Sequence, residues 1–244
     1  MNVRPLDGAR GQFDVDALEA GIRPDGRHFP RSRLVWVEQT SNLGGGSIWP
    51  LERVQTVTDA ARRHRLATHL DGARLMNAVV ASGIAAREWA APFDSAWIDF
   101  TKGLGAPVGA ALAGSGAFIA EAWRLKQQMG GAMRQAGIIA AGGVYALRHH
   151  VKRLADDHAN ARRLAEGLAE LPGVALDPAG VETNIVFFDL TGRLDAAAVV
   201  ERLLARGVRV GALGPRTIRA VTHLDVSAPQ IERALEAARA VLAA

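Results

Sequence analysis

The sequence predicts an α/β protein with a mainly parallel sheet, followed by a second, smaller α+β domain. Apolar, β-branched stretches alternate with amphipathic helical patterns along the first part of the 244 residues, which is typical of a layered α/β domain. From about Gly173 the strand-like stretches become shorter. With 49% hydrophobic residues, the chain can bury a sizeable core in one large or two small domains.

The first domain is expected to contain four strands and four helical segments. "RLVWVE" has the composition of a buried strand, and the helix after it opens with Pro50 in its first turn. The last helical segment is long, and we expect it to be bent or broken around "LRHHV". The expected strands are 33–38, 66–71, 95–101 and 109–114, and the expected helices are 50–65, 74–83, 115–128 and 134–171.

The second domain is predicted from four short strands and two helices. The strands are "GVALD", "TNIVFFDL", "GVRVGAL" and "TIRAVTHL", and the helices are "LDAAAVVERLLARG" and "SAPQIERALEAARAVLAA". We therefore expect a large domain over residues 1–147 and a small domain over 148–244. No internal repeat or low-complexity linker is evident.

Composition narrows the classes of function. The absence of cysteine excludes disulfides, thiolate metal sites and thiol catalysis. The first residues hold no apolar run typical of a signal peptide, and no stretch approaches the roughly 20 apolar residues of a membrane span. These features predict a soluble cytoplasmic protein that does not bind membranes.

The charge pattern does not favour nucleic acid. The net charge is +4 and the pI is near 10.2, but the arginines alternate with acidic residues along the helices, as in "QIERALEAARA". Aromatic residues make up only 5% of the chain. Scattered charges of this kind normally mark solvated helix faces.

Lysine is scarce, which makes one of its positions informative. Lysine occurs only at Lys102, Lys126 and Lys152, whereas Lys and Arg together number 29. An amine can lose its proton and attack a carbonyl, which a guanidinium cannot do at a workable pH. Lys102, in "WIDFTKGLGAPVG", is therefore a candidate for amine chemistry, although a solvated lysine in a turn explains this stretch alone equally well.

Polar side chains follow three of the expected strands, where ligands of parallel sheets bind. One strand runs into "EQTSN" and three glycines, the next ends at Asp71 with Arg74 a few residues later, and a third ends at Lys102. An Asp can keep a pyridine nitrogen protonated, a Lys can form a Schiff base, and an Arg can bind a carboxylate bidentately. Together they indicate a pyridoxal phosphate enzyme. In isolation, Asp71 is equally well a turn residue and Arg74 a surface ion-pair partner.

Four motifs in order resemble one family. "HLDGARLMNA", then "DFTKGLGAPVG" with Lys102 31 residues after Asp71, then "GGAMRQAGIIAAGGVYAL" and "IRAVTHLDVS" are similar to the low-specificity L-threonine aldolase and β-eliminating lyase family. The resemblance extends from about Leu6 over nearly the whole chain. It implies pyridoxal 5'-phosphate as cofactor and pyridoxal phosphate fold type I, whose large domain has three α/β/α layers.

The resemblance also implies roles for individual residues. Lys102 resembles the Schiff-base lysine and Asp71 the partner of the pyridine nitrogen. Arg74 and Arg219 resemble the pair that binds the substrate carboxylate, Arg134 resembles a residue near the cofactor phosphate, and Ser41 falls in the cofactor-binding loop. His69 and His223 are interpreted as structural, and no metal site is expected.

The chain departs from the family pattern in two places. Where relatives read "E-N-T-H-N", this chain has "EQTSN", and the hydroxyl of Ser41 cannot replace an imidazole as a base near neutral pH. The fold also normally occupies about 350 residues, so we expect an N-terminally truncated large domain without its phosphate-binding loop and ring-stacking histidine. Weak cofactor binding should follow, with an exposed apolar face near "GLGAPVG" and the glycines after Asn42.

Three functions remain open on the sequence. The first is a lyase that cleaves threonine, allo-threonine or a related β-hydroxy-α-amino acid to glycine and an aldehyde. The second is β-elimination from another amino acid. The third is a non-catalytic remnant that acts only through subunit contacts. The resemblance implies a homo-oligomer, either a dimer or a tetramer built from dimers.

Overall fold

The computed structural model describes residues 2–242, which form two compact units. The N-terminal unit comprises the described residues up to Gly44 together with Ile48–Val151. The C-terminal unit comprises Gly45–Ser47 and the described residues from Lys152 onward. Helix α6 (Gly137–His149) lies wholly within the N-terminal unit, and domain bounds of 1–147 and 148–244 stay a prediction.

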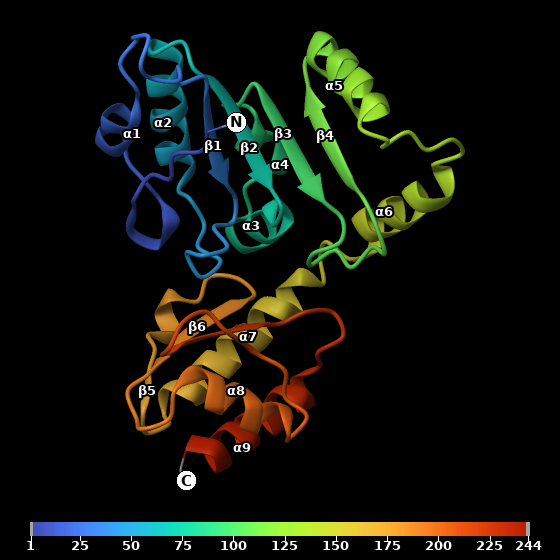
Figure 1. Ribbon diagram of the computed structural model, residues 1–244. Coiled ribbons are helices and arrows are strands. Elements are labelled where there is room, and N and C mark those ends of the chain that lie inside the picture. The colour runs from blue at the N-terminus through green and yellow to red at the C-terminus, as the bar shows by residue number, and fades with distance from the viewer. Residues whose placement is uncertain (1, 243–244) are drawn as a thin grey trace. The chain divides into compact units, whose positions relative to one another are not determined.

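A four-stranded sheet forms the centre of the N-terminal unit (Figure 1). Its strands lie in the order β1-β2-β3-β4, and β1, β2 and β3 run parallel while β4 is antiparallel to β3. The expected mainly parallel sheet is confirmed, with β4 as the exception. The strands are β1 (Leu34–Glu38), β2 (Ala67–Gly72), β3 (Ser95–Asp99) and β4 (Ala110–Gly114).

The helices of this unit follow the predicted order, with two additions. The short helices α1 and α4 were not predicted, because five to seven residues are too few to establish a helical repeat. Asp14 caps α1 by accepting from Ala17 N at 2.8 Å. The helices are α1 (Val15–Gly21), α2 (Leu51–Arg63), α3 (Leu75–Ser82), α4 (Ala86–Ala90), α5 (Gly116–Gln128) and α6 (Gly137–His149), with a 3-10 turn at Ala9–Gly11.

The core of the N-terminal unit lies against one face of its sheet. Val35 and Val37 of β1 are buried among residues of α1 and α2, and Phe13 meets Trp49 edge to face with ring centroids 5.0 Å apart. The alternate residues Leu34 and Trp36 are exposed. The two faces of β1 therefore have different surroundings, as the alternation of side chains along a strand requires.

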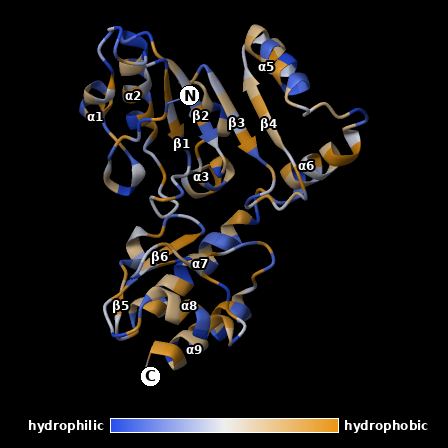
Figure 2. Cartoon of the chain, in the orientation of Figure 1, coloured by the Kyte–Doolittle hydropathy of each residue, from blue (hydrophilic) through white to orange (hydrophobic). Residues whose placement is uncertain are grey.

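Apolar side chains are exposed over β4, α5 and α6. All five residues of β4 are exposed and α5 buries none of its residues. Hydropathy colouring marks apolar positions along these elements (Figure 2). Val108 in "GLGAPVG" and Leu43 after Asn42 are also exposed, whereas Leu104 and Ala106 in "GLGAPVG" are buried. The larger exposed apolar side chains here are Leu112, Phe118, Trp123, Leu125, Met129, Met133, Ile138, Val144, Tyr145 and Leu147.

The C-terminal unit is the expected α+β domain, with an antiparallel sheet in the order β5-β6-β8-β7. Thr183 Oγ1 donates to Gly46 O at 2.7 Å, which ties Gly45–Ser47 to this unit. Its elements are α7 (Leu154–Ala169), β5 (Val174–Ala175), a 3-10 turn at Pro178–Gly180, β6 (Ile185–Leu190), α8 (Ala196–Leu204), β7 (Gly211–Ala212), β8 (Thr217–Val221) and α9 (Ala228–Leu242).

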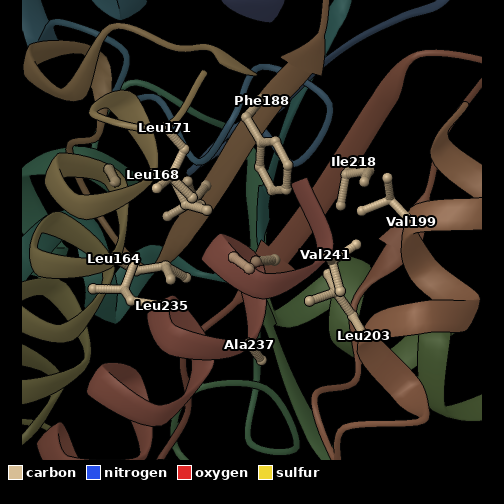
Figure 3. Packing of buried hydrophobic residues seen from close by; sticks show 14 of the residues in the cluster. Leu164, Leu168, Leu171, Phe188, Val199, Leu203, Ile218, Leu235, Ala237 and Val241 are labelled. Carbon is tan, nitrogen blue, oxygen red and sulfur yellow. The ribbon is translucent and has the colours of Figure 1, made fainter. Parts of the chain in front are cut away.

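The core of the C-terminal unit joins its three helices to its sheet (Figure 3). Phe188 of β6 and Ile218 of β8 pack among leucines and valines of the helices. The labelled helical residues are Leu164 and Leu168 of α7, Val199 and Leu203 of α8, and Leu235, Ala237 and Val241 of α9. The long helix predicted over 134–171 is broken between α6 and α7, at the predicted place.

Candidate functional site

The candidate site lies where the three parallel strands end. Asp71 is paired in register with Glu38 of β1 and with Trp97 of β3. Since β3 continues in the same direction, the chain beyond Asp99 leaves the sheet at the edge where β2 ends. The parallel register thus brings the strand ends that carry Asp71 and Lys102 to one edge of the sheet. Thr40, just beyond β1, is buried there, and its Oγ1 has no hydrogen-bond partner among the described residues.

Asp71 is a buried carboxylate with defined donors. The residue is only 8% exposed, and its Oδ1 accepts from Ala73 N at 3.0 Å. Burial raises the pKa of Asp71, and Ala73 N–H, His69, Trp36 and Arg74 oppose that rise. A cationic partner favours the ionised form of such a buried carboxylate.

Lys102 lies in the turn that follows β3. Its Nζ forms an ion pair with Asp99 Oδ2 at 3.0 Å, and its side chain is 43% exposed while that of Asp99 is 9% exposed. Asp99 Oδ1 accepts from both Thr101 N and Thr101 Oγ1 at 2.6 Å. Burial favours a higher pKa for Asp99, but the hydrogen bonds from Thr101 and Lys102 outweigh it and lower the pKa. Sequence reasoning missed Asp99, although an acid three residues before a rare lysine is a usable signal.

Arg74 lies close enough to Asp71 to act on it electrostatically. It is the N-cap residue of α3, and its backbone N–H donates to Gln39 O at 3.3 Å. Its positive charge lowers the pKa of Asp71. Arg74 therefore belongs to the same strand-end cluster, while its predicted role in carboxylate binding stays a prediction.

Ser41 is held inside a tight loop. It is 5% exposed, and its Oγ accepts from Gly44 N at 3.2 Å. A Cβ placed on Gly11 would collide with Ser41 Oγ, and one placed on Gly44 would collide with Arg10 O. These close approaches fix the Ser41 hydroxyl against the backbone, so a cofactor contact for Ser41 stays a prediction.

Arg134 and Arg219 belong to other elements than the strand ends that carry Asp71 and Lys102. Arg134 is exposed in the turn that precedes α6. Arg219 lies on β8 of the C-terminal unit, in register with Phe187 and Gly211. The predicted meeting of Arg219 with Arg74 around a substrate carboxylate, and the role of Arg134 near the cofactor phosphate, stay predictions.

The two histidines of the motifs have protein partners. His69 Nδ1 lies 2.8 Å from Ser95 Oγ, and His223 Nδ1 lies 2.9 Å from Asp225 Oδ1. Among residues 2–242, no cluster of three or more His, Asp or Glu side chains is arranged to bind a metal ion. Within the same range, none of the helices has the length and hydropathy needed to cross a bilayer.

Comparison with known sequences identifies relatives over almost the whole chain. Residues 1–191 match the family described as beta-eliminating lyase. The chain is 41% identical over 241 residues to the low specificity L-threonine aldolase of Escherichia coli K12, which covers 98% of this chain and 70% of the relative. It is 36% identical over 229 residues to low-specificity L-threonine aldolase 1 of Arabidopsis thaliana, covering 92% and 64%.

Comparison with solved structures supports the same fold. The Leishmania major threonine aldolase matches with a TM-score of 0.76 at 20% identity, covering 96% of this chain and 69% of that one. The Sphingomonas wittichii serine palmitoyltransferase matches with a TM-score of 0.71 at 22% identity, covering 93% and 58%. At these identities the matches establish the fold alone.

Proposed function

Because this chain belongs to the beta-eliminating lyase family, we propose that it is a pyridoxal 5'-phosphate-dependent aldehyde-lyase. Its substrate is L-threonine, L-allo-threonine or a related β-hydroxy-α-amino acid, and its products are glycine and an aldehyde. The observation that carries the proposal is the parallel pairing of β2 with β3, which brings the ends bearing Asp71 and Lys102 to one edge of the sheet. The threonine aldolases among the relatives support the substrate class.

The side chains at this edge fit the cofactor. Asp71 is a buried carboxylate whose pKa is raised by burial, and a protonated ring nitrogen is the partner that it needs. Lys102 supplies a primary amine that is 43% exposed and therefore accessible to an aldehyde. Pyridoxal phosphate bound here supplies an electron sink for the electrons released when the Cα–Cβ bond breaks.

The chain's own residues hold and orient the reactants. Asp71 would hold the ring nitrogen in its protonated form, and Lys102 would hold the cofactor through its amine. Arg74 and Arg219 bind the substrate carboxylate, for which the planar guanidinium is well shaped. Arg134 is assigned to the cofactor phosphate and Ser41 to the loop beside the cofactor.

Assembly into a homo-oligomer, as a dimer or a homotetramer, belongs to the same proposal. The exposed apolar side chains of β4, α5 and α6 support it, because monomers rarely expose apolar patches of more than a few hundred Å². We propose a cytoplasmic location for this assembly. Light scattering after size-exclusion chromatography measures the oligomer, and fractionation of cells measures the location.

Absorbance spectroscopy with added cofactor tests the proposed function. The full chain should develop the visible band of lysine-bound pyridoxal phosphate and release glycine and acetaldehyde from L-threonine. Lys102→Ala should lose both, whereas Lys152→Ala should keep both, because Lys152 is also exposed but lies outside the site. A band that survives in Lys102→Ala, or ammonia released in place of glycine, would contradict the proposal. The second outcome would favour β-elimination.

A further inference from the structure

The loop that carries Lys102, residues 100–109, is closed by hydrogen bonds of its own backbone. Gly105 N donates to Lys102 O at 2.9 Å, and Ala106 N donates to Phe100 O at 2.7 Å. The first of these bonds joins residues three apart, as in a β-turn that starts at Lys102. Both bonds lie within the loop, so contacts with another element must hold the loop against the rest of the N-terminal unit.

Helix α6 packs closely on this loop. A Cβ added at Gly143 would lie 3.0 Å from the ring of Phe100, and one added at Gly142 would lie 3.0 Å from Cδ of Pro107. Such distances are shorter than ordinary van der Waals contact, so a larger residue at either position would crowd the loop. The two glycines therefore let the helix backbone approach the loop.

His150, directly after α6, forms a hydrogen bond to the loop. Its Nδ1 lies 2.6 Å from the carbonyl oxygen of Leu104. A carbonyl oxygen can only accept, so Nδ1 carries the proton and donates it. Leu104 comes two residues after Lys102 and is only 3% exposed, whereas Lys102 is exposed. The bond thus joins the buried side of the turn to the end of α6.

The imidazole ring of His150 is itself held in place. It meets the ring of Tyr145 edge to face, with centroids 5.4 Å apart and planes at 85°. The backbone N–H of His150 donates to Ala146 O at 2.8 Å, which continues the helical pattern of α6. A ring fixed in this way loses little freedom when it donates to the loop.

We propose that His150 is a positioning residue that anchors the turn after Lys102 to α6 and thereby holds the Lys102 amine where it meets the cofactor. His150 acts through the carbonyl of Leu104 and touches no reacting atom. This inference rests on the proposed function for the role of Lys102. A lysine held by an anchored turn meets an aldehyde more often in a productive geometry than one on a mobile loop.

The test compares three variants of the full chain. His150→Phe keeps a ring against Tyr145 and removes the donor to Leu104. His150→Asn keeps a donor, because its Nδ2 is as many bonds from Cβ as the histidine Nδ1. His149→Phe is the matched control, since His149 is the neighbouring histidine, is exposed, and also lies against Tyr145, with ring centroids 4.4 Å apart.

Two measurements report on the loop. The first is hydrogen exchange of the Gly105 and Ala106 amides in cofactor-free protein, followed by NMR, because exchange of these amides requires local opening of the turn. The second is the fraction of Lys102 modified after brief addition of pyridoxal phosphate and reduction with borohydride. Peptide mass spectrometry gives this fraction relative to Lys126, an exposed lysine on α5.

His150→Phe should speed exchange at Gly105 about fivefold and lower the ratio of Lys102 to Lys126 modification about fivefold, as expected for one lost hydrogen bond. His150→Asn should retain most of both properties, and His149→Phe should change neither. If His150→Phe fails to fold, His150→Leu measured in the same way decides the question.

A lower melting temperature with unchanged exchange and an unchanged ratio would show that the bond only stabilises the fold, and it would overturn the proposal. Equal losses in His150→Phe and His150→Asn would also overturn it, because the ring rather than the donor would then be responsible. The exchange measurement needs no cofactor. Its outcome is therefore separate from that of the Lys102→Ala test of function.

Discussion

Lys102 Nζ lies 3.0 Å from Asp99 Oδ2, and the two residues are separated by only three positions at the end of β3. Asp99 is nearly buried and is held by two hydrogen bonds from Thr101. The Asp99 carboxylate is therefore fixed by partners other than the lysine. This ion pair must open before the amine can meet an aldehyde.

Asp99→Asn should make cofactor binding faster at neutral pH. The amine must leave its ion pair with Asp99 before it can attack a carbonyl, and asparagine cannot form that ion pair. We expect a gain of up to about fivefold in the rate of band formation, which is the size of the effect of a partly exposed ion pair. Stopped-flow absorbance measures this rate. Asp189→Asn, on β6, is the control, and equal rates in the two variants would contradict the prediction.

Ser41→His should destabilise the protein rather than restore a catalytic base. The Ser41 hydroxyl lies against Gly11 and Gly44, and overpacking of such a site costs about 1–3 kcal/mol. Urea unfolding monitored by circular dichroism measures the loss. Ser41→Ala, which adds no volume, separates this steric effect from loss of the hydrogen bond to Gly44 N. A Ser41→His variant as stable as Ser41→Ala would contradict the packing argument.

Gly72→Ala should disrupt the strand end that carries Asp71. A Cβ at this position would collide with the backbone oxygen of Trp97 on β3 and lie 3.2 Å from Leu75 Cβ, so the strands must move apart. We expect a decrease of about 1–3 kcal/mol in the free energy of unfolding. Gly116→Ala is the control, because a Cβ there meets nothing within 4 Å. Equal stability of the two variants would show that β2 and β3 accommodate an added Cβ near Asp71, and it would contradict the prediction.

Arg153→Met should destabilise the C-terminal unit strongly. Arg153 binds both carboxylate oxygens of Asp157 at 2.6 and 3.1 Å, and the Asp157 side chain is fully buried. Removing one member of a buried pair leaves an uncompensated charge, at a cost of about 3 kcal/mol or more. Arg124→Met breaks the exposed pair with Glu121 and should change stability little. Differential scanning calorimetry compares the two, and similar melting temperatures would count against the prediction.

Arg219→Lys should raise KM for the amino acid about tenfold while leaving the melting temperature unchanged. Lysine keeps the charge but loses the planar fork that binds a carboxylate bidentately. If Arg219 binds substrate, the loss falls on KM rather than on folding. Steady-state kinetics of the active holoenzyme measure it, with Arg202→Lys on the exposed side of α8 as control. An unchanged KM would remove Arg219 from the proposed site.

Local patterns in the sequence determined most of the secondary structure of this protein. Apolar, β-branched runs indicated β1, β2 and β3, and the helical pattern over 134–171 was expected to be bent or broken around "LRHHV", where α6 ends before α7 begins. The scarcity of lysine singled out Lys102, and the motif order indicated the family. These signals are readable because each depends on residues close together in the chain.

The contacts at the candidate site were decided only by the tertiary structure. The antiparallel direction of β4, the pairing of Asp71 with Glu38 and Trp97 and the close approach of Gly11 to Ser41 all depend on segments that are distant in sequence. An apolar strand has the same composition in either direction, and a hydrogen bond across strands depends on their register. Register is fixed by packing of the whole sheet, and no stretch of sequence read alone specifies it.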